Sequence, residues 1–387
     1  MSDYNQFYVR LIRVFIFLFL IVKSNVAENL SPGNCVQTFS SDVDYFPSKV
    51  TVTTASLFTI KYNNNYKLVT NTDSKETFAL VQCGTPVPTG LPAGTKVFNI
   101  SFNNVAIMDT SVVPFLEALN LTVISATNMT LQNQQLSQVD AVFDSMFNLS
   151  NPKTIGISAA SDPGPLNRAE WIKFYSVFFN LEDKANTFYD QISNNYNCLK
   201  NLPSSNNPPT VAWVSYNAPS SFNNNTASWA ITDAPYKKIL TENAGGIYFN
   251  TTPLSYSTSS SFLSAIANVD ILIDETFIAR DISEVYTNFN LNANDVQYKF
   301  VKNSAIYRED GVTSPGDGRD WFESAVLLAD NVLEDMMNVI NPNLPTNDYK
   351  RVWLRNVAKG ELIKLSSPSN CSDASVALTV NYSNFLL

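Results

Sequence analysis

Aromatic and basic residues between the periodic segments are the side chains of this sequence best suited to bind something. Tyr216 and Trp229 lie where neither helical nor strand periodicity is visible, so their flat rings could stack on a planar ligand or be partly buried against their own lobe. Arg319 follows Gly316 and Gly318, which leave its loop open to close approach. An arginine in that position suits a carboxylate or phosphate partner.

The chain has no histidine. This removes Ser-His-Asp and Cys-His catalysis and any histidine-ligated metal site. Carboxylate chemistry remains open at Asp274 and Glu275, so a carboxylate-dependent hydrolase is kept as an alternative. Glu170 is either a contact at the floor of a cleft or a negative charge favoured at the start of a helix. We predict no enzyme, no catalytic residue, no metal site and no cofactor.

The charge balance limits the partners. The formal net charge is −9, whereas nucleic acids and anionic membranes attract basic surfaces. We therefore expect no nucleic-acid partner.

The first residues predict export. Arg10 and Arg13 precede the apolar run 14–22, which has the layout of a secretory signal peptide over residues 1–27. The run is too short for a spanning helix of about 20 residues; an uncleaved anchor or a buried strand is the alternative. We expect the protein to be secreted, extracellular or at the cell surface, with Asn-x-Ser/Thr glycosylation sequons at Asn29, Asn99, Asn120, Asn128, Asn148, Asn224, Asn250, Asn370 and Asn381.

Four cysteines in an oxidising compartment predict two disulfides, with three possible connectivities. The pairing that we favour joins Cys35 to Cys83 and Cys198 to Cys371. The first would tie the start of the mature chain to a nearby strand, and the second would tie the end of a long helix to the tail.

Hydrophobic periodicity divides the chain. Residues 43–82 alternate as a β-meander, and a helical pattern runs over 168–202, with residues 180–183 as a candidate kink or break. On either side of that helix, strands and helices alternate, which is typical of parallel sheets covered by helices. Strands are expected at 96–101, 121–124, 154–157, 210–215, 269–274 and 305–307, and helices at 110–119, 138–147, 236–244, 262–267 and 321–340.

The expected fold class is α/β, with two Rossmann-like lobes joined by one long connector helix and the β-meander on the first lobe. The expected parts are a signal peptide (1–27), an N-terminal lobe (28–160), the connector (161–202), a C-terminal lobe (203–340) and a tail (341–387).

Short motifs resemble the helical-hinge (class III) substrate-binding proteins for vitamin B12, haem and iron-siderophores. The step Ala-Leu-Asn-Leu at 118–121, the Asn-Ala-Gly-Gly at 243–246 and the strand at 269–273 carry this general likeness. The stretches Ala-Glu-Trp-Ile-Lys-Phe (169–174) and Arg-Asp-Trp-Phe-Glu (319–323) resemble the secreted eukaryotic branch, which includes algal cobalamin-acquisition proteins.

The resemblance implies a secreted solute-binding protein, related to those of ABC transporters. It would capture a bulky corrinoid, other tetrapyrrole or iron-siderophore between its lobes for uptake. It would be a monomer that hands its ligand to a membrane transporter or receptor. A surface or cell-wall module with a decayed cleft is a further alternative.

The loops beyond the carboxyl ends of the strands are the expected site, because ligands of open α/β sheets bind there. The predicted ligand-binding residues are Asn103, Asn104, Pro165, Arg168, Tyr216, Trp229, Glu275, Arg308, Arg319 and Trp321.

Overall fold

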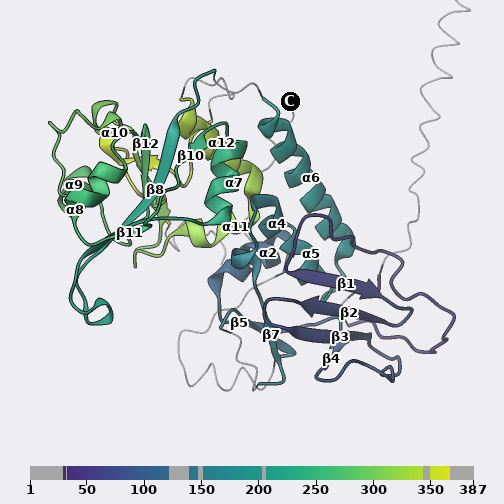
Figure 1. Ribbon diagram of the computed structural model, residues 1–387. Coiled ribbons are helices and arrows are strands. Elements are labelled where there is room, and N and C mark those ends of the chain that lie inside the picture. The colour runs from purple at the N-terminus through teal and green to yellow at the C-terminus, as the bar shows by residue number, and fades with distance from the viewer. Residues whose placement is uncertain are drawn as a thin grey trace, which may run out of the picture.

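The computed structural model describes residues 29–31, 33–121, 139–146, 151–202, 206–342 and 349–366. The predicted signal peptide, most of the strand predicted at 121–124, and Cys371 lie outside these residues. Within them, no helix combines the length and the apolar character that a membrane span requires. The fold is α/β with several sheets, arranged as a lower and an upper lobe with helices between them (Figure 1).

The meander predicted from the alternating residues is present. Strands β1 (Phe58–Tyr62), β2 (Tyr66–Asn71) and β3 (Glu76–Gln82) pair antiparallel, as the side-chain alternation indicates. Strand β4 (Lys96–Ile100) adds to β3 in parallel and completes a four-stranded sheet. One face of the sheet packs its aromatic and aliphatic side chains into the main core.

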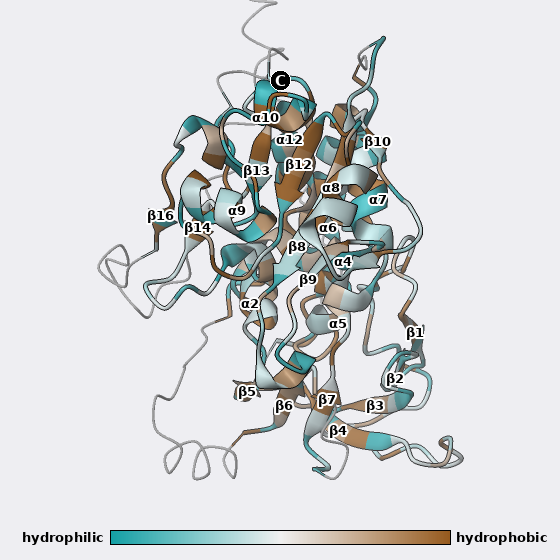
Figure 2. Cartoon of the chain, turned by 60° about the vertical axis from the view of Figure 1, so that its left-hand side comes forward, coloured by the Kyte–Doolittle hydropathy of each residue, from teal (hydrophilic) through white to brown (hydrophobic). Residues whose placement is uncertain are grey.

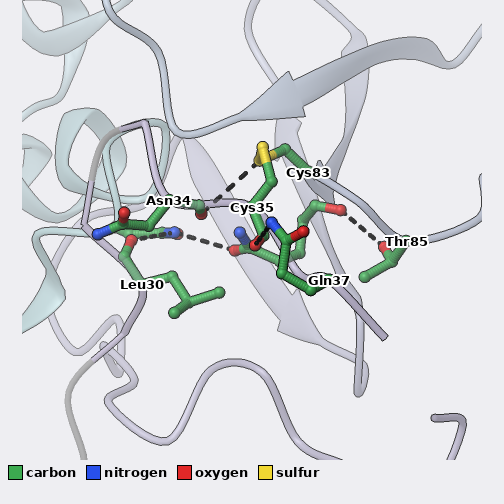
Figure 3. Close-up of a disulfide and its surroundings, with 8 residues drawn as sticks. Leu30, Asn34, Cys35, Gln37, Cys83 and Thr85 are labelled. Carbon is green, nitrogen blue, oxygen red and sulfur yellow. Dashed lines mark hydrogen bonds between the residues drawn. A yellow bond between two sulfur atoms is a disulfide. The ribbon is translucent and has the colours of Figure 1, made fainter. Parts of the chain in front are cut away.

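A disulfide fastens the N-terminal segment to this sheet. Cys35 is bonded to Cys83 directly after β3 (Figure 3). The backbone N–H of Val36 donates to the carbonyl of Cys83. The first half of the favoured pairing is therefore confirmed. Cys198 lies exposed at the end of α6, and because Cys371 is outside the described residues, the second half stays a prediction.

A second, parallel sheet completes the first lobe. It consists of β5 (Val105–Ile107), β6 (Ala141–Asp144) and β7 (Thr154–Gly156), with the short helix α2 (Val113–Ala118) after β5. The helix predicted at 138–147 is wrong, because residues 141–144 form a strand. A short run that is buried on both sides carries no periodicity by which to tell a strand from a helix.

The connector is broken into three helices. These are α4 (Pro165–Ala169), α5 (Trp171–Ser176) and α6 (Glu182–Lys200). The main break is at Asn180, whose φ of +57° is left-handed, a conformation that asparagine tolerates better than most residues. The connector is therefore not one continuous helix, and its main break falls at the start of the stretch 180–183, which the sequence marks as a candidate kink or break. Helix α6 runs from the meander toward the second lobe (Figure 1).

The second lobe is built on a sheet with the order β11-β9-β8-β12-β13-β15. Its centre is parallel: β8 (Thr210–Asn217), β12 (Ile271–Asp274) and β13 (Ile306–Arg308). The remaining strands are β9 (Ser228–Ile231), β10 (Ile247–Tyr248), β11 (Ser255–Tyr256) and β15 (Arg355–Asn356), and a separate pair joins β14 (Val312–Thr313) to β16 (Lys364–Leu365).

Helices cover both faces of this sheet, whose central strands are strongly apolar (Figure 2). Trp213 of β8 packs with α6, α7 (Pro235–Asn243) and α12 (Ala329–Ile340) in the main core. Its neighbours Ala212 and Val214 pack on the opposite face. The helices on that face are α8 (Ser259–Ala265), α9 (Ile282–Phe289) and α10 (Lys299–Lys302).

The helix predicted at 321–340 is also interrupted. A 3-10 turn over Asp320–Phe322 and the helix α11 (Ser324–Leu327) precede α12. Glu323 and Leu328 lie between them with non-helical backbone angles. The interruption leaves Trp321 and Phe322 at the junction of the lobes.

The exposed sequon asparagines among the described residues are Asn99, Asn120, Asn224 and Asn250. Asn29 differs from them, because its side-chain amide is buried and donates to the carbonyl of Ser48 and to Glu182.

Candidate functional site

A cavity of about 360 Å³ lies between the lobes. It is bounded by the segment after β5, by α4, by the first turn of α7 and by the segment around Trp321. Its lining residues are Asp109, Ser111, Ala160, Arg168, Ala234, Tyr236, Lys237, Glu275, Trp321, Phe322 and Val326.

Arg168 of α4 and Tyr236 of α7 meet in this cavity. The guanidinium carbon lies 3.7 Å from the centre of the tyrosine ring, and Nε donates to the carbonyl oxygen of Asp162 at 2.9 Å. Burial lowers the pKa of Arg168 despite the opposing effect of Tyr236 and Asp162. The contact joins the connector to the second lobe.

Lys237 is held by two carboxylates and two indoles. Its Nζ lies 2.8 Å from Glu275 and 2.8 Å from Glu309, and 4.0 and 4.7 Å from the ring centres of Trp213 and Trp321. Burial acts to lower the pKa of Lys237, but the two carboxylates outweigh it and the pKa is raised. Lys237 is therefore a charged part of the wall, with two of its three N–H donors directed at carboxylates.

A groove of about 1020 Å³ opens beside the cavity, beyond the carboxyl ends of β8 and β12. Three phenylalanines line it with unusually high exposure: Phe222 is 100% exposed, Phe277 71% and Phe322 56%. Glu275 and Phe322 line both the groove and the cavity, so the two spaces adjoin.

The structure brings four of the predicted ligand-binding residues to these two spaces. Arg168, Glu275 and Trp321 line the cavity, and Tyr216 and Glu275 line the groove. The expected location beyond the carboxyl ends of the second-lobe strands therefore agrees with where the groove lies.

Tyr216 and Trp229 are not loop residues. They face each other across the pair β8–β9, with ring centres 5.4 Å apart. Trp229 also donates from its indole nitrogen to the carbonyl of Asn288 and does not line the groove. Trp229 therefore packs against the ring of Tyr216, which itself lines the groove.

Asn103 and Asn104 lie at the wrong edge of the first-lobe sheet. They precede β5, and their backbone N–H groups donate to Asp140, which precedes β6. The prediction took residues 96–101 as the first strand of this sheet, but β4 belongs to the meander sheet. The carboxyl edge therefore begins one strand later, at Asp109 and Ser111.

Arg308 and Arg319 are internal. Arg308 is fully buried and binds Asp274, Asp310 and the carbonyl of Thr276. Arg319 pairs with Glu309 at 3.0 Å and donates to the carbonyls of residues 275–277. Neither arginine lines the cavity or the groove. Both instead donate to backbone carbonyls in the loop after β12, at residues 275–277.

Pro165 is likewise buried, as the first residue of α4, where its fixed φ suits a helix start.

The residues that the sequence did not single out are mainly aromatic. Phe277 lies two residues after Glu275 and Phe322 directly follows Trp321, whereas Phe222 lies between Tyr216 and Trp229 in the sequence. Tyr236 and Lys237 were read only as the start of a helix, and Asp109 as the residue before one. The signal in the sequence that could have identified them is the presence of aromatic side chains in the loops that follow the strands.

The carboxylates of Asp274 and Glu275 do not face a common cavity, as a catalytic pair would. Asp274 is fully buried against Arg308, and burial raises its pKa despite that partner. Glu275 accepts from Lys237 and Thr232. The arrangement offers no water-accessible pair for hydrolysis among these two side chains.

Comparisons with known proteins give distant relatives. No family model matches the chain. It is 23% identical over 220 residues to an uncharacterized lipoprotein of Methanocaldococcus jannaschii, which covers 54% of this chain and 49% of that protein. The chain thus spans about half the length of the curated relative that it matches.

Several solved structures are similar at low scores. An ABC transporter substrate-binding protein from Listeria monocytogenes has a TM-score of 0.44 at 16% identity, covering 62% of this chain and 98% of that one. A periplasmic heme binding protein from Pseudomonas aeruginosa has 0.44 at 8% identity, covering 66% and 98%. A possible iron-binding periplasmic protein from Staphylococcus epidermidis has 0.45 at 14% identity, covering 62% and 100%.

Proposed function

We propose that this chain is a non-enzymatic solute-binding protein that captures a bulky, partly flat and apolar small molecule in the groove of the second lobe. A corrinoid or other tetrapyrrole is the favoured ligand, and an iron-siderophore complex is the next. The short motifs in the sequence support the same class.

The observation that carries this proposal is the gathering of Phe222, Phe277 and Phe322 around one groove. Exposed large aromatic side chains that line one groove are typical of a binding surface. Their rings would stack on a flat ligand face. The volume of about 1020 Å³ is at the upper end of small-molecule sites.

The remaining features fit a ligand that brings its own metal. Because the chain has no histidine, a bound iron or cobalt complex would keep its own ligands. A groove of this size also argues against the alternative of a decayed cleft.

We place the binding outside the cytosol. The disulfide Cys35–Cys83 supports an oxidising compartment, and the archaeal relative is named a lipoprotein. A monomer at that location would pass its ligand to a transporter or receptor in the membrane.

Titration of the full chain with haemin, cyanocobalamin and a ferric hydroxamate siderophore tests the proposal by absorbance and tryptophan fluorescence. We expect micromolar or tighter binding of at least one. Phe277→Ser should weaken it about tenfold or more, since burying a phenylalanine contributes about 1.5–3 kcal/mol.

Phe39→Ser is the matched control, because Phe39 is 38% exposed and stacks on Tyr45 away from the groove. It should leave binding unchanged. Failure of all three ligands to bind, or equal losses in both variants, would contradict the proposal.

A further inference from the structure

Arg168 keeps open hydrogen-bonding capacity in the inter-lobe cavity. A guanidinium has five N–H donors. Among the residues that the structure describes, only Nε of Arg168 has an acceptor, the carbonyl of Asp162. The side chain is half-buried and stacked on Tyr236, so its planar end is held in place with both Nη groups unbonded. An acceptor that enters the cavity can therefore bond these donors in place of water.

The other charged groups lining the cavity have partners within the described chain. Lys237 is held by Glu275 and Glu309, and Glu275 also accepts from Thr232. Asp109 accepts from Ser111 and Ser145, which hold its pKa below the ordinary value against the opposing effect of burial. Among the described residues that line this wall, Arg168 is thus the charged side chain with the most donors open to a ligand.

The first turn of α7 adds positive potential at the same place. Ala234, Tyr236 and Lys237 line the cavity, and within the part of the chain that the structure describes no side chain caps this nine-residue helix. Its first backbone N–H groups and the positive end of its dipole therefore favour an anion beside Arg168.

The cavity and the groove differ in volume, and so they suit different parts of one ligand. The cavity of about 360 Å³ suits a side group, whereas the groove of about 1020 Å³ suits a bulky body. Since they share Glu275 and Phe322, one molecule can occupy both.

We infer that the ligand carries an anionic group, a carboxylate or phosphate, which binds Arg168 in the inter-lobe cavity while its flat apolar part lies on the phenylalanines of the groove. This inference rests on the proposed function and specifies the class of ligand. It sets tetrapyrroles with free acid side chains above uncharged analogues of the same ring.

The test compares two probes that share a ring and differ in charge: protoporphyrin IX and its bis(2-hydroxyethyl) amide. Binding to the full chain is followed by quenching of tryptophan fluorescence. The diacid should bind at least about tenfold tighter than the amide, as expected for a charge-assisted hydrogen bond. Arg168→Gln should remove this difference by weakening the diacid alone, and Arg168→Lys should keep part of it.

Lys299→Gln is the control for net charge. Lys299 is paired with Asp270 at the amino edge of the second-lobe sheet, away from both spaces, so its loss should change neither affinity.

Equal binding of diacid and amide by the unchanged protein would overturn the inference and leave the proposed function standing. Equal weakening of both probes by Arg168→Gln would overturn it as well, since it would show that Arg168 only supports the lobe junction. If neither porphyrin binds while cyanocobalamin or the siderophore does, with no effect of Arg168→Gln, the inference also fails. If no probe binds, both proposals fail.

Discussion

Nζ of Lys67 lies 2.5 Å from Oε1 of Glu182, and neither side chain has any exposed surface. Lys67 comes from β2 of the meander and Glu182 from the start of α6. The ammonium also donates to the carbonyl of Val177 and to Oδ1 of Asn180, both of which lie in the break between α5 and α6. This buried pair ties the meander to the point where the connector changes direction.

Lys67→Met should lower the free energy of unfolding by about 3–5 kcal/mol, because it leaves the carboxylate of Glu182 buried without its cation. Urea unfolding at pH 7 measures the loss. The double variant Lys67→Met/Glu182→Leu removes both charges and should recover much of the stability. A double variant no more stable than the single one would show that the charge pair is not the source of the effect.

Stability should fall in acid through Glu170. Burial acts to raise the pKa of this carboxyl, but Lys173 and the N–H groups of Ala55 and Thr54 outweigh it and lower the pKa from 4.5 to about 2. Since the folded-state pKa lies below the unfolded one, Glu170 stabilises the fold above pH 4.5. That contribution, roughly 3 kcal/mol, is lost between pH 4.5 and about 2.

Glu170→Gln should therefore be much less stable than the unchanged protein at pH 7, and the difference should shrink toward pH 2. Urea midpoints at several pH values measure this. Glu242→Gln, at an exposed position on α7, is the control and should not alter the pH profile. A gap that stays constant from pH 7 to 2 would contradict the assignment.

Removing the disulfide with Cys35→Ser/Cys83→Ser should cost about 2–4 kcal/mol, since it closes a loop of 48 residues in the unfolded chain. Thermal unfolding under non-reducing conditions measures it. Thiol titration of the denatured full chain addresses the second pair: no free thiol is expected if Cys198 bonds to Cys371, and Cys198→Ser should then expose one. Two free thiols in the unchanged protein would refute that pair.

Local pattern was enough for the elements whose residues alternate strongly. Strands β1 and β2 were predicted because their side chains are buried and accessible in alternation, and α12 because its apolar side chains recur at helical steps. The central strands β8, β12 and β13 are largely buried and were predicted from short apolar runs. The run Ala141–Asp144 is buried in the same way, and there the prediction was a helix, because such a run has no period that separates the two.

The site depended on which strands become neighbours. Residues 96–101 were correctly predicted as a strand, yet β4 pairs with β3 of the meander, and so the ligand edge moved from Asn103 to Asp109. Arg308 and Arg319 were chosen for their charge, but buried carboxylates at Asp274, Asp310 and Glu309 take up that charge.

The residues alone indicated an α/β chain with a meander, two disulfides and no histidine chemistry, because these follow from composition, cysteine number and local periodicity. The expected binding role came instead from the resemblance of short motifs to substrate-binding proteins. The tertiary structure decided which charges are free. Arg168 and Arg319 are the same residue type, yet one keeps open donors beside a cavity and the other spends its donors on backbone carbonyls. Tertiary packing determines this difference, since it places the ring of Tyr236 over Arg168 and the carboxylate of Glu309 beside Arg319. Local sequence periodicity contains no information about either contact.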